Sequence, residues 1–194
     1  MGFFHLLWKC AYTLYLSYFM TIKTIFLDRD GVINNDTGYL YKVEDCKFIN
    51  GVFEACQYFK SLGYQIIIVT NQSGISRGYF SEKDFQIISD WMIDQFQANN
   101  INILDIFHCP HAPEYKCDCR KPEPGMFILA KNKYNIDMNK SWMIGDSERD
   151  ITAANLAGIQ NTILVRSGHK IDEFESNSMF FLDSIFQAKQ VIKI

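Results

Sequence analysis

Two aspartates separated by one residue directly follow a short apolar run. The run is residues 24–27 (TIFL), and the segment after it is residues 28–31 (DRDG). In an extended chain alternate side chains share a face, so we expect Asp28 and Asp30 to project together while Arg29 points away. One carboxylate can attack phosphorus as a nucleophile while the other transfers the proton of the leaving group. The pair therefore indicates metal-assisted phosphoryl transfer, although an ordinary acidic turn after a strand has the same composition.

A second polar segment follows the next strand-like run. Residues 65–69 (QIIIV) form the run, and residues 70–74 (TNQSG) come directly after it. A hydroxyl, an amide and the backbone N–H groups of a turn, all at the carboxyl end of a strand, can form an uncharged cradle for phosphate. A strand-end turn without a ligand is the alternative. The residues predicted to bind phosphate here are Thr70, Asn71, Gln72 and Ser73.

Two further segments supply the charges that phosphoryl transfer needs. Arg120 and Lys121 precede a proline, and Lys121 can offset the charge of the nucleophilic carboxylate and of the phosphoryl group. Asp146 follows another short apolar run and would complete an oxygen-rich magnesium site with Asp28 and the backbone carbonyl of Asp30. Taken singly, these segments also fit a solvated basic pair and the acidic start of a helix. Four such segments at predicted strand ends favour the catalytic interpretation.

Three cysteines and a histidine form a CxH…CxC set with a short connecting loop. Its members are Cys109, His111, Cys117 and Cys119. Three thiolates and an imidazole match a closed tetrahedral zinc site that has no open position for catalysis. The alternative is a group of reduced cysteines in a loop. Because Cys119 is bonded to Arg120, we expect a structural zinc ion that holds the loop carrying the two basic residues.

Four motifs of this chain resemble those of the haloacid dehalogenase phosphatase superfamily. They read FLDRDGVIN, VTNQSG, CRKPEPGM and MIGDSERD, and the resemblance spans about residues 22–166. It implies an aspartyl-phosphate formed on Asp28, acid–base transfer by Asp30, and magnesium as a cofactor. It also implies that Arg120 and the loop after the first strand contact the sugar end of the substrate. The loop residues are Asp36, Thr37, Gly38 and Tyr39.

Two branches of that superfamily are similar to this chain, one acting on heptose bisphosphates and the other on histidinol phosphate. The histidinol branch typically has an acidic residue at the position of Ser73, whereas Ser73 followed by Arg77 suits an anionic sugar. The resemblance therefore implies removal of the C7 phosphate from D-glycero-D-manno-heptose 1,7-bisphosphate, a step of bacterial heptose-nucleotide synthesis. Histidinol-phosphate hydrolysis and a non-catalytic phosphosugar-binding scaffold are the alternatives. Asp150 has two interpretations, a partner of the site or a helix-capping acid.

The composition describes one globular domain rather than a disordered chain. The chain has 194 residues, a net charge of −3, 48% hydrophobic and 15% aromatic residues, which is enough for one substantial core. Mild acidity disfavours nucleic-acid binding, which needs a basic face. Cys10, Cys46 and Cys56 are scattered, which favours a reduced, cytoplasmic protein with one metal cluster. We expect a monomer that acts on a small sugar phosphate.

Apolar runs alternate with helical patterns along the chain. Strands are predicted at 24–27, 64–70, 103–108, 141–144 and 161–165, and helices at about 51–61, from 81, at 124–134 and at 148–157. This alternation predicts an α/β fold, with a Rossmann-like parallel sheet that has helices on both faces. The spans 32–63 and 74–119 leave no room for a separate cap domain. Residues 21–194 are thus predicted to form a single haloacid dehalogenase-like phosphatase domain with a zinc-bound loop.

The first twenty residues do not fit this pattern. Residues 3–20 are apolar and aromatic, but Lys9 falls inside the stretch and no small-residue cleavage site follows, unlike in a signal peptide. The run 10–20 is short for a membrane span. We interpret residues 1–20 as a mis-called start or a loosely attached extension. An amphipathic anchor to a membrane or a partner is the alternative.

Overall fold

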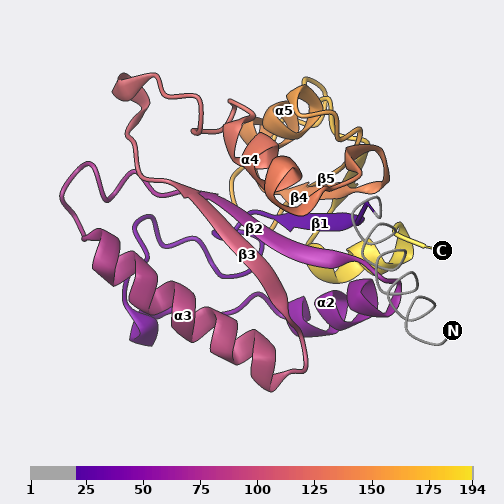
Figure 1. Cartoon of the computed structure of the whole chain (residues 1–194), viewed down its shortest axis with the longest axis horizontal. Coiled ribbons are helices and arrows are strands. Elements are labelled where there is room, and N and C mark those ends of the chain that lie inside the picture. The colour runs from indigo at the N-terminus through magenta and orange to yellow at the C-terminus, as the bar shows by residue number, and fades with distance from the viewer. Residues whose placement is uncertain (1–20, 194) are drawn as a thin grey trace, which may run out of the picture.

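A six-stranded parallel sheet runs through the computed structural model, which describes residues 21–193 (Figure 1). The strand order is β3-β2-β1-β4-β5-β6, and every neighbouring pair is parallel. The strands are β1 (Thr24–Leu27), β2 (Gln65–Asn71), β3 (Ile103–Cys109), β4 (Trp142–Gly145), β5 (Asn161–Val165) and β6 (Phe180–Leu182). This order places the carboxyl ends of β1, β2 and β4 side by side, which is where parallel α/β sheets bind ligands.

Helices cover both faces of the sheet, which confirms the predicted fold class. Figure 1 shows α2 and α3 on one side and α4 and α5 on the other. The helices are α2 (Val52–Ser61), α3 (Glu82–Ala98), α4 (Gly125–Tyr134) and α5 (Glu148–Leu156). Short 3-10 helices are η1 (Val43–Asp45), η2 (Pro113–Tyr115), η3 (Met138–Lys140) and η4 (Ile185–Gln190). The predicted boundaries differ from these by a residue or so at most ends, whereas β6 and η4 were not predicted.

Two hydrophobic clusters, one on each face, hold the sheet between the helices. Ile25 and Leu27 of β1 pack into the cluster formed with α2, α3 and η4, whereas Phe26 packs against α4 and α5. The ring of Phe26 lies 5.1 Å from that of Phe127. Burial on both faces explains why the strands read as continuous apolar runs rather than alternating ones.

The connections between strands are short, as predicted. Between β1 and β2 lie only η1 and α2, and between β2 and β3 lies only α3. Neither connection contains a cap domain, so the loops at the carboxyl ends of the strands are the groups that can cover a ligand. Within residues 21–193, no helix is long and apolar enough to cross a membrane. The interpretation of residues 1–20 concerns a segment outside the described residues.

Candidate active site

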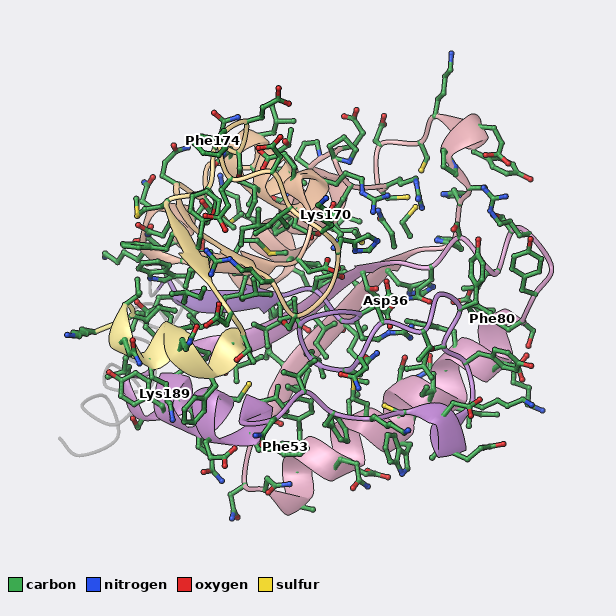
Figure 2. All side chains as sticks on the ribbon, turned by 180° about the vertical axis from the view of Figure 1, so that it is seen from behind. Asp36, Phe53, Phe80, Lys170, Phe174 and Lys189 are labelled. Atoms are coloured by element: carbon green, nitrogen blue, oxygen red, sulfur yellow. The ribbon has the colours of Figure 1, made fainter. Side chains whose placement is uncertain are left out.

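The carboxyl ends of β1, β2 and β4 surround a cavity of about 350 Å³. Figure 2 shows Asp36 on the connection after β1, at one side of this region. The lining residues are Asp28, Asp30, Asp36, Gly38, Tyr39, Thr70, Asn71, Ser73, Arg77, Pro113, Arg120, Lys121, Asp146, Ser147, Arg149, Asp150 and His169. The residues predicted at separate strand ends therefore meet in one place. Two predicted binding residues, Thr37 and Gln72, are not among those that line it.

Lys121 occupies the buried centre of this cavity, with a side chain only 2% exposed. Its Nζ lies 2.9 Å from Asp28 Oδ1, contacts Asp150 Oδ1 and donates a 2.7 Å hydrogen bond to the carbonyl of Val69. Burial alone would lower the pKa of Lys121, but the carboxylates of Asp150 and Asp28 outweigh it and raise that pKa above its ordinary value. The ammonium group is therefore held charged beside Asp28.

The Asp28 carboxyl lies in a strongly desolvated position. Burial raises the pKa of Asp28 to about 6, and the attraction of Lys121 offsets only part of that effect. The nearby carboxylates of Asp150 and Asp30 raise it further. Asp28 therefore lies next to a positive charge, yet its pKa stays above the ordinary value for an aspartate.

Asp30 is held in a fixed orientation by three neighbours, Arg29, Asn34 and Gln72. The Arg29 guanidinium is 3% exposed and binds the Asp30 carboxylate, with Nη2 2.8 Å from Oδ2. Asn34 and Gln72 donate to the same carboxylate at 2.9 and 3.1 Å. Asp28 and Asp30 both line the cavity and Arg29 does not, which agrees with the predicted alternation, although the Arg29 guanidinium turns back to bind Asp30.

Three carboxylates converge on one point beside Lys121. Asp28, Asp146 and Asp150 each offer an oxygen within 4.8 Å of the others. Burial and the charge of Asp28 raise the pKa of Asp146 above its ordinary value, although His169 lowers it in part. Asp28 Oδ1 is buried, and its partner is the Lys121 ammonium group at 2.9 Å. A set of hard oxygen donors with an excess of negative charge suits magnesium.

Asp150 fits both interpretations that the sequence left open. It lies in the first turn of α5, where its Oδ2 accepts a 3.0 Å hydrogen bond from the backbone N–H of Ser147. Its Oδ1 contacts Lys121 Nζ. Asp150 therefore helps to cap the N-terminus of α5 and contacts the lysine at the same time.

Thr70, Asn71 and Ser73 of the TNQSG segment form another part of the cavity wall. The Thr70 hydroxyl accepts a 2.8 Å hydrogen bond from Gln72 Nε2, which leaves its own proton free to point at a ligand. Gln72 itself is buried behind the wall, against Arg29 and Asp30. The Asn71 amide pairs with the backbone of Lys121, accepting from its N–H at 3.1 Å and donating to its carbonyl at 3.0 Å. This reciprocal pair fixes the basic segment to the end of β2.

The mouth of the cavity lies between two loops with aromatic side chains. The rings of Tyr39 and Tyr79 meet edge to face with centroids 4.6 Å apart. Those of Tyr41 and Phe80 stack at 5.5 Å. The loop after β1 and the loop after β2 therefore contact each other beside the cavity.

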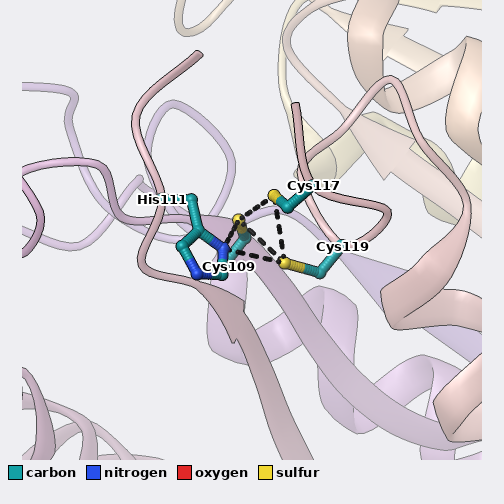
Figure 3. Close-up of side chains that lie close together, drawn as sticks. All are labelled: Cys109, His111, Cys117 and Cys119. Carbon is teal, nitrogen blue, oxygen red and sulfur yellow. Dashed lines mark hydrogen bonds between the residues drawn. The ribbon is translucent and has the colours of Figure 1, made fainter. Parts of the chain in front are cut away.

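The predicted zinc ligands are brought together at the end of β3 (Figure 3). Cys109 Sγ lies 3.1 Å from Cys119 Sγ and 3.5 Å from Cys117 Sγ. His111 Nδ1 lies 3.3 Å from Cys119 Sγ. None of these cysteines forms a disulfide. The four atoms enclose a position with three sulfur ligands and one nitrogen ligand, which is the donor set of structural zinc sites.

The zinc-ligand cluster is joined directly to the cavity through Arg120. Arg120 Nη1 donates a 3.0 Å hydrogen bond to the backbone carbonyl of His111. Burial, together with the charges of Arg149 and Arg77, lowers the pKa of Arg120 below its ordinary value. The loop of the cluster thus holds Arg120 in place through this hydrogen bond, although Arg149 and Arg77 repel its charge.

Sequence reasoning assigned no role to two ionisable residues that line this cavity, Arg149 and His169. Arg149 lies in the MIGDSERD motif, but its spacing from Asp146 gives no indication of a function. His169 follows β5 in a segment without periodicity, and its Nδ1 lies 2.7 Å from Asp146 Oδ2. Only the folded chain brings His169 to the motif residues, so no local signal could have identified it.

Comparison with known proteins identifies the family. A family model described as HAD-hydrolase-like matches residues 118–185. A D-glycero-alpha-D-manno-heptose-1,7-bisphosphate 7-phosphatase of Photorhabdus laumondii is 42% identical over 179 residues, covering 89% of this chain and 97% of the relative. A D-glycero-beta-D-manno-heptose-1,7-bisphosphate 7-phosphatase of Vibrio cholerae is 47% identical over 174 residues, covering 86% and 94%. The chain belongs to this family of haloacid dehalogenase-like phosphatases.

A solved structure agrees with this assignment. The D,D-heptose 1,7-bisphosphate phosphatase from B. bronchiseptica, complexed with magnesium and phosphate, is 30% identical and superposes with a TM-score of 0.77. The match covers 88% of this chain and 97% of that structure. The phosphatase family predicted from the four motifs is thereby confirmed, and its heptose branch is favoured over the histidinol branch.

Proposed function

We propose that this chain is a magnesium-dependent phosphatase that removes the C7 phosphate of D-glycero-D-manno-heptose 1,7-bisphosphate. The observation that carries the proposal is the buried contact of Lys121 with both Asp28 and Asp150, in a chain whose relatives are named for this reaction. The charged Lys121 and the hydroxyl of Thr70 can bind a phosphoryl group, and the carboxylate of Asp28 then lies next to it as a nucleophile.

Asp28 is the proposed nucleophile. Its carboxylate oxygen attacks phosphorus as the bond to the sugar oxygen breaks, which gives an aspartyl-phosphate. Lys121 lies 2.9 Å from Asp28 Oδ1 and can reduce the repulsion between the carboxylate and the phosphate. Asp150 and the carbonyl of Val69 hold the lysine in that position. Asp150 therefore acts in this proposal by orienting Lys121.

Asp30 is the proposed acid and base. It gives its proton to the departing sugar oxygen, and it then takes a proton from the water that hydrolyses the aspartyl-phosphate. Arg29, Asn34 and Gln72 hold its carboxyl group in a fixed orientation. In this proposal Gln72 positions Asp30 and does not contact the phosphate.

Magnesium fits the three converging carboxylates. We propose that Asp28, Asp146 and the backbone carbonyl of Asp30 hold it, with donor oxygens of the kind this ion prefers. When bound, the ion neutralises charge that develops on the phosphoryl oxygens. Asp28 and Asp146 lie within reach of each other, and the B. bronchiseptica phosphatase is described as a complex with magnesium.

The remaining wall is proposed to bind the phosphate and the sugar. Thr70, Asn71 and Lys121 face the phosphoryl group, and the loop residues Asp36, Gly38 and Tyr39 face the sugar with Ser73. Arg120 would pair with the second phosphate or with ring hydroxyls in a fork geometry. Thr37 does not line the cavity, so we assign it no contact.

The zinc-ligand cluster is proposed to hold one structural zinc ion. Its ligands would be Cys109, His111, Cys117 and Cys119, whose donor atoms lie within 4.8 Å of one another. We further propose a cytoplasmic monomer in which residues 21–194 form one domain that acts on a small molecule and not on nucleic acid. The proposed reaction would be a step of bacterial heptose-nucleotide synthesis.

The test is a comparison of kcat/KM for phosphate release from both anomers of the heptose bisphosphate and from histidinol phosphate. We expect one heptose anomer to give the highest value, and phosphorus NMR to show that the C1 phosphate is retained. The Asp28→Asn variant controls for contaminating phosphatases. A higher value for histidinol phosphate, or loss of the C1 phosphate, would contradict the proposal.

A further inference from the structure

A loop that follows β5 packs directly on the carboxyl group of Asp146. A Cβ atom at Gly168 would overlap Asp146 Oδ2, and so would one at Gly31, where the backbone also has a positive φ of 80°. Only glycine permits this approach at either position. Ser167 Oγ donates a 2.6 Å hydrogen bond to the carbonyl of Gly31. The Ser167–His169 loop is therefore fixed to the turn that carries the two catalytic aspartates.

His169 fills the remaining side of the same oxygen. Its backbone N–H donates to Asp146 Oδ2 at 2.9 Å, and its ring Nδ1 lies 2.7 Å from that atom. Because an ionised carboxylate only accepts hydrogen bonds, Nδ1 is the donor. Among the described residues, Asp146 Oδ1 has neither a hydrogen bond nor an ion pair. One oxygen of the carboxylate is thus fully engaged and the other is left for a cation.

The opposite edge of the ring faces the loop after β1. His169 Nε2 lies 3.8 Å from Asp36 Oδ2, and Asp36 lines the mouth of the cavity. The imidazole, which is 49% exposed, therefore stands between a buried carboxylate and the loop that covers the substrate position. Figure 2 shows the neighbouring Lys170 and Asp36 on adjacent loops on one face of the molecule.

We propose that His169 is a positioning residue for magnesium binding, because its ring fixes the rotamer of Asp146 and reserves one carboxylate oxygen for the cation. This inference rests on the proposed function in one respect, namely that the bound cation is magnesium. Outer hydrogen-bond partners of metal ligands typically change metal affinity by about 10–100-fold. Since the backbone N–H of residue 169 remains in any variant, we expect the ring alone to contribute about tenfold, at the low end of that range.

The test is magnesium binding to the full chain, measured by calorimetry without substrate. We expect His169→Ala to raise the magnesium Kd about tenfold. His169→Asn should restore most of the affinity, because its amide nitrogen can take the place of Nδ1. Lys170→Ala, a change of the next side chain along the loop, is the matched control and should bind as the parent does. An unchanged or lower Kd in His169→Ala would overturn the proposal, since the ring would then make no contribution to magnesium binding or would oppose it.

A second readout separates positioning from a general structural effect. At saturating magnesium, kcat of His169→Ala should return to within about threefold of the parent, while the magnesium concentration for half-maximal rate rises with the Kd. A kcat that stays low with a normal Kd would also contradict the proposal. If the parent failed to hydrolyse heptose bisphosphate but His169→Ala still weakened magnesium binding, the proposed substrate would be wrong and this inference would stand.

Discussion

At the scale of single residues, the centre of the cavity has an excess of buried negative charge. Lys121 contributes one positive charge against Asp28 and Asp150, and Asp146 adds a third carboxylate. Burying carboxylates without enough partners is costly, which explains the raised pKa of Asp28 and Asp146. Because the fold holds these carboxylates together, the site should bind a divalent cation.

Replacing either catalytic aspartate should disable the enzyme in a different way. Asp28→Asn should abolish turnover, because an amide cannot form the acyl-phosphate. Asp30→Asn should lower kcat by about 10²–10⁴-fold through the loss of proton transfer. Beryllofluoride, a phosphate mimic, should bind at Asp28 in the parent and not in Asp28→Asn, as monitored by fluorine NMR. A fully active Asp28→Asn protein would exclude the covalent mechanism.

Magnesium binding should weaken in acid. Because burial raises the pKa of Asp28 to about 6, this ligand is protonated below that pH in the metal-free protein. The cation must then displace a proton, so the apparent Kd should rise by about tenfold for each pH unit below 6. The raised pKa of Asp146 acts in the same direction. Calorimetry between pH 5 and 7.5 at constant ionic strength checks this, and a constant Kd over that range would contradict it.

Arg149 should contribute to binding of the second phosphate. It lines the cavity with Arg120 and Arg77, and among the described residues it forms no ion pair, only a 3.2 Å hydrogen bond to Ser147 Oγ. A charge-assisted hydrogen bond is typically worth about 1.5–3 kcal/mol. We therefore expect Arg149→Ala to raise KM for the bisphosphate at least about tenfold.

A monophosphate provides the control for this prediction. For p-nitrophenyl phosphate, KM of Arg149→Ala should change by less than about threefold, because that substrate has no second anion. Arg149→Lys should retain part of the affinity as a point charge without the fork geometry. Equal losses with both substrates would place Arg149 at the reacting phosphate instead.

At the scale of the elements, the loop between β3 and α4 transmits the effect of zinc to the cavity. Replacing Cys117 with Ser should release zinc and lower kcat/KM, because Arg120 bonds to the carbonyl of His111 and Lys121 follows in the same segment. Elemental analysis should give about one zinc per chain in the parent and less in the variant. Cys46 lies outside the cluster, so Cys46→Ser should leave the zinc content and kcat/KM unchanged. Active parent protein without zinc would refute the structural role.

The elements that carry the site were predictable because local pattern and tertiary role agree. Residues 25–27 and 66–69 are apolar throughout and are buried on both faces of the sheet. Each ends in polar residues that the parallel arrangement gathers at one edge. The hydrogen bonds of Arg29 to Leu40 and Gln72 could not be predicted, because these residues approach it only after folding. The orientation of Lys121 by Asp150 likewise depends on contacts between distant segments.

At the scale of the whole molecule, the C-terminal part was the least predictable. β6 has three half-buried residues, Phe180–Leu182, and extends the sheet only because β5 is already in place. η4 follows it and packs against α2, where Tyr58 donates a 3.1 Å hydrogen bond to the carbonyl of Ile192. Short elements of this kind have no strong period of their own, so the sequence gives little signal for them. They nevertheless complete one face of the core.

This part of the fold should therefore govern stability without governing catalysis. Ile185 of η4 is fully buried in the cluster formed with α2 and α3 and does not line the cavity. Ile185→Ala should lower the free energy of unfolding by about 2–5 kcal/mol, the usual range for such a truncation in a core. Phe174→Ala removes a fully exposed ring and should change it by about 0.5 kcal/mol or less. Urea unfolding measures both values, and kcat at a temperature where both variants are folded should equal that of the parent. A stability of Ile185→Ala close to that of Phe174→Ala would mean that η4 does not belong to the cooperative core, whereas a reduced kcat would mean that this face of the sheet is coupled to the site.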